Sequence, residues 1–204
     1  RSLMPYSISA SQMGKARSDM SGKNTTADTQ TSALLLAICA APDDLSGDVF
    51  RKLDGAGFAA LVDLSIQTRT AGLVQYVLQR VSHRPDDASF ARLQHWSRGQ
   101  AQFSMLQTRS LARCSALLAQ NDIDHVVLKG FVLDQQVYPH KGMRPLRDLD
   151  LLCHPADAER AQGLLLQHGF EPVPGSGQYG VEHGHQLPEI IDPAHKTIYE
   201  IHHR

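Results

Sequence analysis

Residues 143–152 read MRPLRDLDLL and place Asp148 and Asp150 two positions apart in an apolar run. A short apolar run of this kind predicts a buried strand. Because side chains alternate between the two faces of a strand, the carboxylates share one face while Leu149 and Leu151 enter the core. Adjacent carboxylates repel each other unless a cation lies between them, and Mg²⁺ is commonly held by one or two carboxylates and substrate phosphates. The stretch therefore predicts metal-dependent phosphate chemistry, provided that a phosphate site and a third acid lie nearby.

A phosphate site is predicted directly upstream. Residues 123–128 (IDHVVL) are rich in β-branched side chains and predict a strand, and residues 131–138 (FVLDQQVY) predict a short helix. Lys129 and Gly130 lie between them. Glycine lets the backbone approach an anion closely, and the free N–H groups at a helix start point toward it. This order of strand, glycine and helix is typical of phosphate binding.

The third acid lies downstream, where residues 197–203 (TIYEIHH) alternate as a strand does. Glu200 shares a face with Ile198 and His202, while Tyr199 and Ile201 take the other face. On a strand beside the first one, Glu200 would be the third carboxylate.

Together these features resemble the nucleotidyltransferase superfamily that has the DNA polymerase β-like catalytic core. The closer resemblance is to the uncharacterised nucleotidyltransferase-like family found in bacterial gene clusters, and it covers residues 123–203. The matching motifs are Leu128-Lys129-Gly130, Tyr138, Arg144, Asp148-Leu149-Asp150, Gly169-Phe170, His185 and Glu200-Ile201-His202.

The resemblance implies an enzyme that transfers a nucleoside monophosphate from an NTP to an acceptor hydroxyl and releases pyrophosphate. Mg²⁺ or Mn²⁺ would be the cofactor. The implied catalytic and metal-binding residues are Asp148, Asp150 and Glu200, and the implied nucleotide or phosphate contacts are Lys129, Gly130, Arg144, His185 and His202. Arg144 could hold a phosphate or organise its loop.

Two departures from the superfamily pattern support an alternative function. Gly130-Phe131 replaces the usual Gly-Ser, whose serine contacts phosphate, and the chain stops at Arg204, directly after the third acid. We therefore expect a fragment truncated at its C-terminus. The alternative is a catalytically weak nucleotide-binding or partner-binding module that retains the fold.

Net charge and cysteine content limit the classes of partner and the cellular setting that we expect. The net charge of −1 gives no broad basic surface for nucleic acid, so we expect an NTP together with a small-molecule or peptide acceptor. No apolar run approaches the roughly 20 residues that span a bilayer. The three cysteines, Cys39, Cys114 and Cys153, are odd in number and widely spaced, so they predict neither a disulfide framework nor a metal knuckle. We therefore expect the protein to lie in a reducing cytoplasm.

The predicted fold is α+β, with an N-terminal helical subdomain followed by a polymerase β-like core built on a small mixed sheet. We expect a disordered tail over residues 1–32, a helical subdomain over 33–121 and the catalytic core over 122–204. Helices are expected at 33–40, 45–53, 58–67, 71–81, 87–120 and 155–168, and further strands at 170–173 and 183–191. A zinc site formed by His183, His185, His202 and His203 is disfavoured, because His202 and His203 point to opposite faces and no cysteine completes the set.

Overall fold

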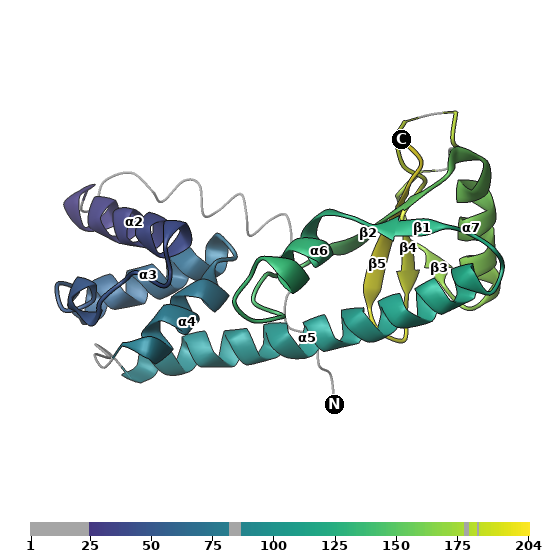
Figure 1. Ribbon diagram of the computed structural model, residues 1–204. Helices are drawn as coiled ribbons and strands as arrows, with labels where there is room; N and C mark the ends of the chain where they lie inside the picture. Colours follow the sequence, from purple (N-terminus) through teal and green to yellow (C-terminus); the bar gives the residue numbers. More distant parts are fainter. Residues whose placement is uncertain (1–24, 82–86, 178–179, 183) are drawn as a thin grey trace.

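The computed structural model describes residues 25–81, 87–177, 180–182 and 184–204. A group of N-terminal helices is followed by a mixed sheet, and one long helix, α5 (Asp87–Ala119), runs alongside both (Figure 1). The N-terminal elements are α2 (Thr25–Ala40), η1 (Gly47–Val49), α3 (Gly55–Gln67) and α4 (Ala71–Arg80). None of the described helices is long and apolar enough to cross a membrane.

The N-terminal helices surround a hydrophobic core of their own. Phe58 and Leu61 from α3 meet Val74 and Leu78 from α4, and all four side chains are fully buried. The first turns of α5 add Phe90 and Leu93 to the same core. Helix α5 later contributes Leu111, Cys114 and Leu118 to a second core beneath the sheet, so this one helix belongs to both.

The start of α2 differs from the prediction. The disordered tail was expected to extend to residue 32, whereas the helix begins at Thr25, and residues 1–24 lie outside the described part. Thr31, Leu35 and Ile38 are buried at helical spacing. The prediction rested on the polar composition of residues 1–32, and composition does not show which few residues face the core. The spacing of Thr31 from the two apolar residues would have indicated the helix.

Two further helix predictions were wrong in detail. Residues 45–53 do not form an α-helix: they contain the short 3-10 helix η1, and Phe50 and Leu53, which follow it, are buried in the core. The helix expected at 58–67 begins three residues earlier, so that Gly55 and Gly57 lie in the first turn of α3. The Asp54 side chain caps this turn by accepting a 2.7 Å hydrogen bond from the Gly57 N–H, which is the usual N-cap geometry.

The sheet has five strands in the order β1-β2-β5-β4-β3. The central pair, β2 and β5, is parallel, and the other neighbours are antiparallel. The predicted α+β fold with a small mixed sheet is therefore confirmed. The strands are β1 (His125–Val127), β2 (Asp148–Cys153), β3 (Glu171–Pro172), β4 (Ile190–Asp192) and β5 (Thr197–His202).

The strand expected at 183–191 is mostly absent. Of the described residues in it, only Ile190 and Ile191 belong to β4, and His183 lies outside the described residues. Pro188 has no N–H to donate to a neighbouring strand, which limits regular pairing here. An isolated bridge between Gln186 and His202 still holds this segment against the end of β5.

Helices cover one face of the sheet. Leu149 and Leu151 of β2 and Tyr199 and Ile201 of β5 are fully buried in the core that they share with α5 and with α7 (Pro155–Gln167). Because side chains alternate along each strand, the polar residues between them point to the opposite face. These polar residues are Asp148, Asp150, Glu200 and His202.

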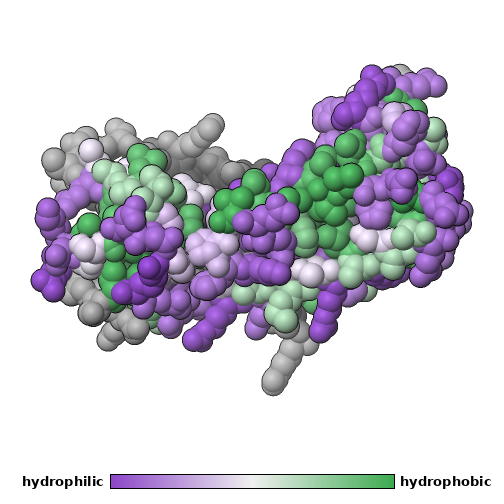
Figure 2. Space-filling view, viewed as in Figure 1, coloured by the Kyte–Doolittle hydropathy of each residue, from purple (hydrophilic) through white to green (hydrophobic). Residues whose placement is uncertain are grey.

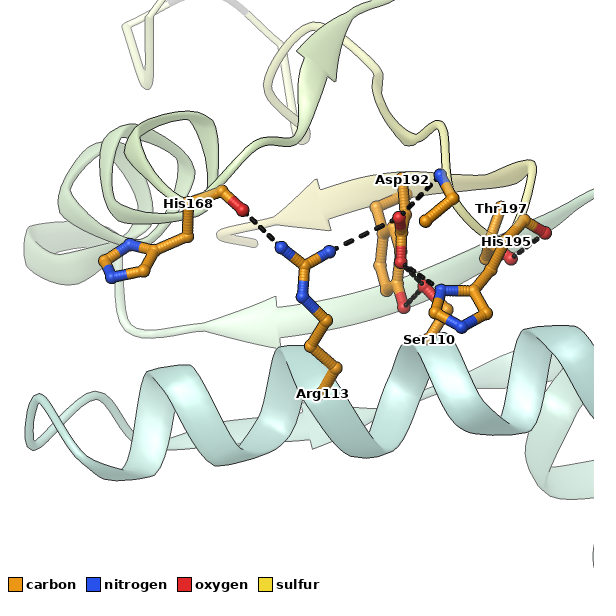
Figure 3. Close-up of polar contacts among 8 residues, drawn as sticks. Ser110, Arg113, His168, Asp192, His195 and Thr197 are labelled. Atoms are coloured by element: carbon orange, nitrogen blue, oxygen red, sulfur yellow. Dashed lines mark hydrogen bonds and ion pairs between the residues drawn. The ribbon is translucent and has the colours of Figure 1, made fainter.

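A buried carboxylate joins α5 to the hairpin of β4 and β5 (Figure 3). Asp192 has no solvent exposure and accepts hydrogen bonds from Ser110 at 2.7 Å and from the Ala194 N–H at 3.1 Å. His195 Nδ1 lies 2.8 Å and Arg113 Nη1 3.3 Å from its oxygens. Burial by itself would raise the pKa of Asp192, but these hydrogen bonds and positive groups outweigh it and hold the pKa below its ordinary value.

A sharp loop follows helix α6 (Lys129–Gln136) and packs against α4 and α5. The buried Asp134 accepts from the N–H groups of Gly142 at 2.8 Å and Arg144 at 2.9 Å, and so fixes the loop's backbone. Gly142 has φ +80°, and a Cβ on Gly72 of α4 would lie 2.6 Å from the Met143 carbonyl oxygen. The loop therefore approaches α4 more closely than any side chain would allow.

Replacing Asp192 with Asn should destabilise the protein by about 2–3 kcal/mol, since hydrogen bonds to a charged group contribute about 1.5–3 kcal/mol.

The lowered pKa means that the wild-type carboxylate stabilises the fold above its unfolded pKa of about 3.9, and that this stability is lost as pH falls through the folded pKa. Urea unfolding at several pH values measures both effects. Asp48→Asn, in an exposed pair with Arg51, is the control and should change stability by less than about 0.5 kcal/mol. Equal effects of the two changes would contradict the role given to Asp192.

Replacing Gly72 with Ala should destabilise the protein by about 1–3 kcal/mol, because the new methyl group overlaps backbone atoms of Met143 and forces the loop away. Gly99→Ala in α5 is the matched control, since a Cβ there meets nothing within 4 Å. It should stabilise the protein by about 0.5–1 kcal/mol through helix propensity alone. Thermal unfolding of both variants measures the difference, and a stabilising Gly72→Ala would contradict the close approach.

Candidate functional site

The parallel pairing of β2 with β5 brings the predicted acids together. Asp150 pairs directly with Glu200, and the pair two residues further along the strands is Leu152 with His202. Asp148, two residues before Asp150, pairs with Ile198. Because paired residues project to the same side of a sheet, all three carboxylates and the imidazole lie on the face that α5 and α7 leave uncovered.

Asp150 is the centre of this group. Its side chain is 6% exposed, and Oδ1 lies 2.6 Å from Lys129 Nζ and 2.8 Å from His202 Nε2. The same two nitrogens lie 3.2 Å from each other. The hydrogen bond to Asp150 is the main reason why the pKa of Lys129 is raised, and the charges of Asp150, Glu200 and Asp148 act in the same direction. Lys129 is therefore a stable positive charge beside the acids.

Glu200 approaches the group from β5. Its Oε2 lies 3.4 Å from His202 Nε2. Burial raises the pKa of Glu200, and the negative charges of Asp148 and Asp150 raise it further. One ligating atom from each of Asp150, Glu200 and His202 lies within 4.8 Å of the others, a spacing that a single metal ion can bridge.

Asp148 is placed differently from the other two acids. It lies on the same face and is half-buried, but it does not belong to the group whose ligating atoms lie within 4.8 Å of one another. It still acts on the site electrostatically, since its charge contributes to the raised pKa of Glu200. The predicted set of three acids thus shares one face, and two of them, Asp150 and Glu200, belong to the group that could hold a metal ion.

The glycine turn lies next to the acids. The Leu128 N–H donates a 2.9 Å hydrogen bond to the Asp150 carbonyl oxygen, which ties the turn to β2. Lys129 has φ +48°, a left-handed conformation that non-glycine residues rarely adopt and that is enriched at functional sites. Leu128, the N-cap residue of α6, has no side-chain acceptor for the first N–H groups of the helix. These groups are available to an anion.

Arg144 lies against this turn. A Cβ on Gly130 would be 3.5 Å from Arg144 Nε and 2.9 Å from Leu146 Cδ2, so any larger residue would displace the arginine or the leucine. Arg144 Nε is buried and has no hydrogen-bond partner among the described residues. The Arg144 N–H donates a hydrogen bond to Asp134 at 2.9 Å, so the residue takes part in organising its loop, and its contact with an anion stays a prediction.

The histidines divide between two environments. The rings of His185 and His202 stack with centroids 5.6 Å apart, which places His185 beside the acidic group. His203, after the end of β5, is buried, and burial lowers its pKa. Within the described residues, the group that could hold a metal contains two acids and one histidine, a set unlike the histidine cluster considered for zinc.

The contact between Lys129 and Asp150 was not predicted. Lys129 was expected to contact phosphate, and its link to the acids depends on the antiparallel pairing of β1 with β2, which sets Val127 opposite Leu151. Leu128, the next residue of the chain, then donates its N–H to the Asp150 carbonyl oxygen, and Lys129 follows beside the acids. An LKG motif directly after a short strand is the only sequence signal of this contact, and it does not identify the neighbouring strand.

Comparison with known proteins agrees with this geometry. A model of the uncharacterised nucleotidyltransferase family matches residues 54–204, about three quarters of the chain. The chain therefore belongs to this family. The match begins at the N-cap of α3 and includes α3, α4 and α5 together with the sheet, so the family domain covers part of the helical half. Searches of curated proteins and of solved structures give no significant match.

Proposed function

We propose that this protein is a Mg²⁺-dependent nucleotidyltransferase, which transfers a nucleoside monophosphate from an NTP to an acceptor hydroxyl with loss of pyrophosphate. The observation that carries the proposal is the convergence of Asp150, Glu200 and His202 beside the Lys129–Gly130 turn. Family membership supports nucleotidyl transfer as the reaction class.

The donor set fits a divalent cation. Two carboxylates and one imidazole offer ligating atoms within 4.8 Å of one another, and the carboxylates are the ligands that Mg²⁺ prefers. The imidazole also suits Mn²⁺. Asp150 and Glu200 would hold the metal, and Asp148 on the same face would hold a second one. The chemistry that the metal would supply is neutralisation of negative charge on the reacting phosphate.

The residues of the turn would bind the phosphates. The first N–H groups of α6 and the small Gly130 admit an anion at the helix start, and Arg144 adds a guanidinium at the same place. Lys129 supplies a positive charge between this turn and Asp150. In this reaction a protein contributes mainly positioning and charge stabilisation, so these residues would orient the triphosphate rather than react with it.

The acceptor that we propose is a small molecule or a peptide. Figure 2 shows hydrophobic surface over α6 and the neighbouring part of the sheet, and exposed apolar residues of these elements are Val126, Leu133 and Val137. A polynucleotide would need several cations to neutralise its phosphates, but the net charge of the chain is −1. We also propose a reducing cytoplasmic setting, which the three free cysteines support.

The second candidate function is a nucleotide-binding or partner-binding module with little catalysis. The specific observation in its favour is the ammonium group of Lys129, which pairs with Asp150 where a metal ion would otherwise bind. Titration calorimetry with NTPs, with and without Mg²⁺, separates the two functions. Metal-dependent binding without pyrophosphate release would favour the module, and no NTP binding would contradict both.

Replacing Asp150 with Asn should reduce turnover at least about 100-fold, because the variant loses a negatively charged metal ligand at the point where phosphate charge develops. Pyrophosphate release from each NTP, measured with a panel of small-molecule and peptide acceptors, gives the readout. Asp124→Asn, an exposed acid beside β1, is the matched control and should retain full turnover. Circular dichroism must show both variants folded, and wild-type turnover in folded Asp150→Asn would refute the metal assignment.

Replacing Lys129 with Met should strengthen Mn²⁺ binding in the absence of NTP and weaken NTP binding. The variant removes a cation that competes for Asp150, and two charges about 4 Å apart in water interact by about 1 kcal/mol, which corresponds to about fivefold in affinity. Calorimetric titrations with Mn²⁺ alone and with NTP alone measure the two effects. Lys52→Met, an exposed lysine far along the chain from the acids, serves as control. Weaker Mn²⁺ binding by Lys129→Met would contradict competition between the ammonium and the metal.

A further inference from the structure

A cleft lies among α4, the first half of α5 and the loop at residues 140–143. It has a volume of about 210 Å³. Its wall includes Gln75 and Tyr76 from α4, Trp96, Ser97 and Gln100 from α5, and His140 from the loop. None of the residues that line it belongs to the acidic group on the sheet.

Three residues that line this cleft each carry a buried polar atom without a hydrogen-bond partner in the described part of the chain. Gln75 Oε1, Ser97 Oγ and Gln100 Nε2 are buried from solvent and make no hydrogen bond with any described residue. Buried polar groups are satisfied in the great majority of cases, and each one left unpaired costs about 1–3 kcal/mol. Ser97 and Gln100 lie three residues apart and so share one face of α5. Small rotations of the flexible glutamine side chains would turn their amides toward a polar molecule in the cleft.

The remainder of the wall combines aromatic surface with positive charge. The rings of Tyr76 and His140 meet edge to face with centroids 5.5 Å apart, and Trp96 adds a large apolar surface. Arg98 and Lys141 are exposed cations at the cleft, and no acidic residue is among the described residues that line it. The wall therefore favours a ligand that has an apolar face, several hydrogen-bonding groups and a negative charge.

We propose that this cleft binds an anionic sugar of monosaccharide size, such as a sugar phosphate or a sugar acid. Its volume is below the roughly 300–1,000 Å³ of pockets for drug-sized ligands, which leaves too little room for a nucleoside triphosphate. The apolar face of the ring packs on Trp96, the hydroxyl groups pair with the orphaned amides and with Ser97, and the anion meets Arg98 and Lys141. The site is independent of nucleotidyl transfer.

Trp96 is the single tryptophan of the chain, so its fluorescence reports directly on this cleft. We would titrate the protein separately with glucose 6-phosphate and glucuronate, and with glucose and inorganic phosphate as partial probes. We expect a saturable change with at least one sugar anion, at an affinity at least about tenfold higher than with either partial probe. The same change should remain in Asp150→Asn, which alters the acidic group alone.

A matched pair of variants tests the hydrogen bonds. Gln100→Ala should weaken binding of the sugar anion about tenfold, as expected for a lost hydrogen bond in a buried site, without lowering the melting temperature, because it removes an unsatisfied group. Gln102→Ala, two residues along α5 and exposed, should bind as the wild type does. The proposal is overturned if neither sugar anion binds with a Kd below about 1 mM, which corresponds to a binding free energy of about −4 kcal/mol. It is also overturned if phosphate alone binds equally well, or if the two variants behave alike.

Discussion

The parallel pairing of β2 with β5 is the constraint on which the rest of the site depends. Parallel strands cannot be joined by a tight turn, so the chain must leave β2, pass through α7 and the β3–β4 pair and return beside β2. That path has a single register, in which Asp150 lies opposite Glu200. A shift by one residue would send Glu200 into the apolar core and replace it with Tyr199 or Ile201.

The two faces of the sheet differ in how their negative charges are balanced. On the covered face, Asp192 is satisfied completely by neighbouring donors, so it holds α5 against the β4–β5 hairpin and offers nothing to a ligand. On the uncovered face, three carboxylates share the surface with one ammonium and one imidazole. Burial raises the pKa of Glu200, and the charges of Asp148 and Asp150 raise it further. The excess of negative charge on this face is what a cation would neutralise.

Local patterns predicted the elements that carry the site, and long-range contacts account for what they missed. The Asp148–Asp150 strand, the strand of Glu200 and α5 were predictable, because each has a periodic apolar side that a single stretch of sequence displays. The 3-10 turn at Gly47 and the short β4 were not, since Phe50 and Ile190 are buried by tertiary contacts rather than by regular structure of the predicted length. The bond between Lys129 and Asp150 and the clustering around Asp192 join distant segments, and one sequence alone does not show which segments meet.

The shared helix α5 also determines how this protein should come apart. At 33 residues it is about 50 Å long, and its two ends are buried in different hydrophobic cores. Neither core can lose its part of the helix without exposing Phe90 and Leu93 at one end or Leu111 and Leu118 at the other. If one end of α5 unfolds, the helix that packs in the other core becomes shorter. Unfolding of the N-terminal helices would therefore also destabilise the sheet that carries the acidic group. We therefore expect the two halves to unfold as one cooperative unit, although each has a core of its own.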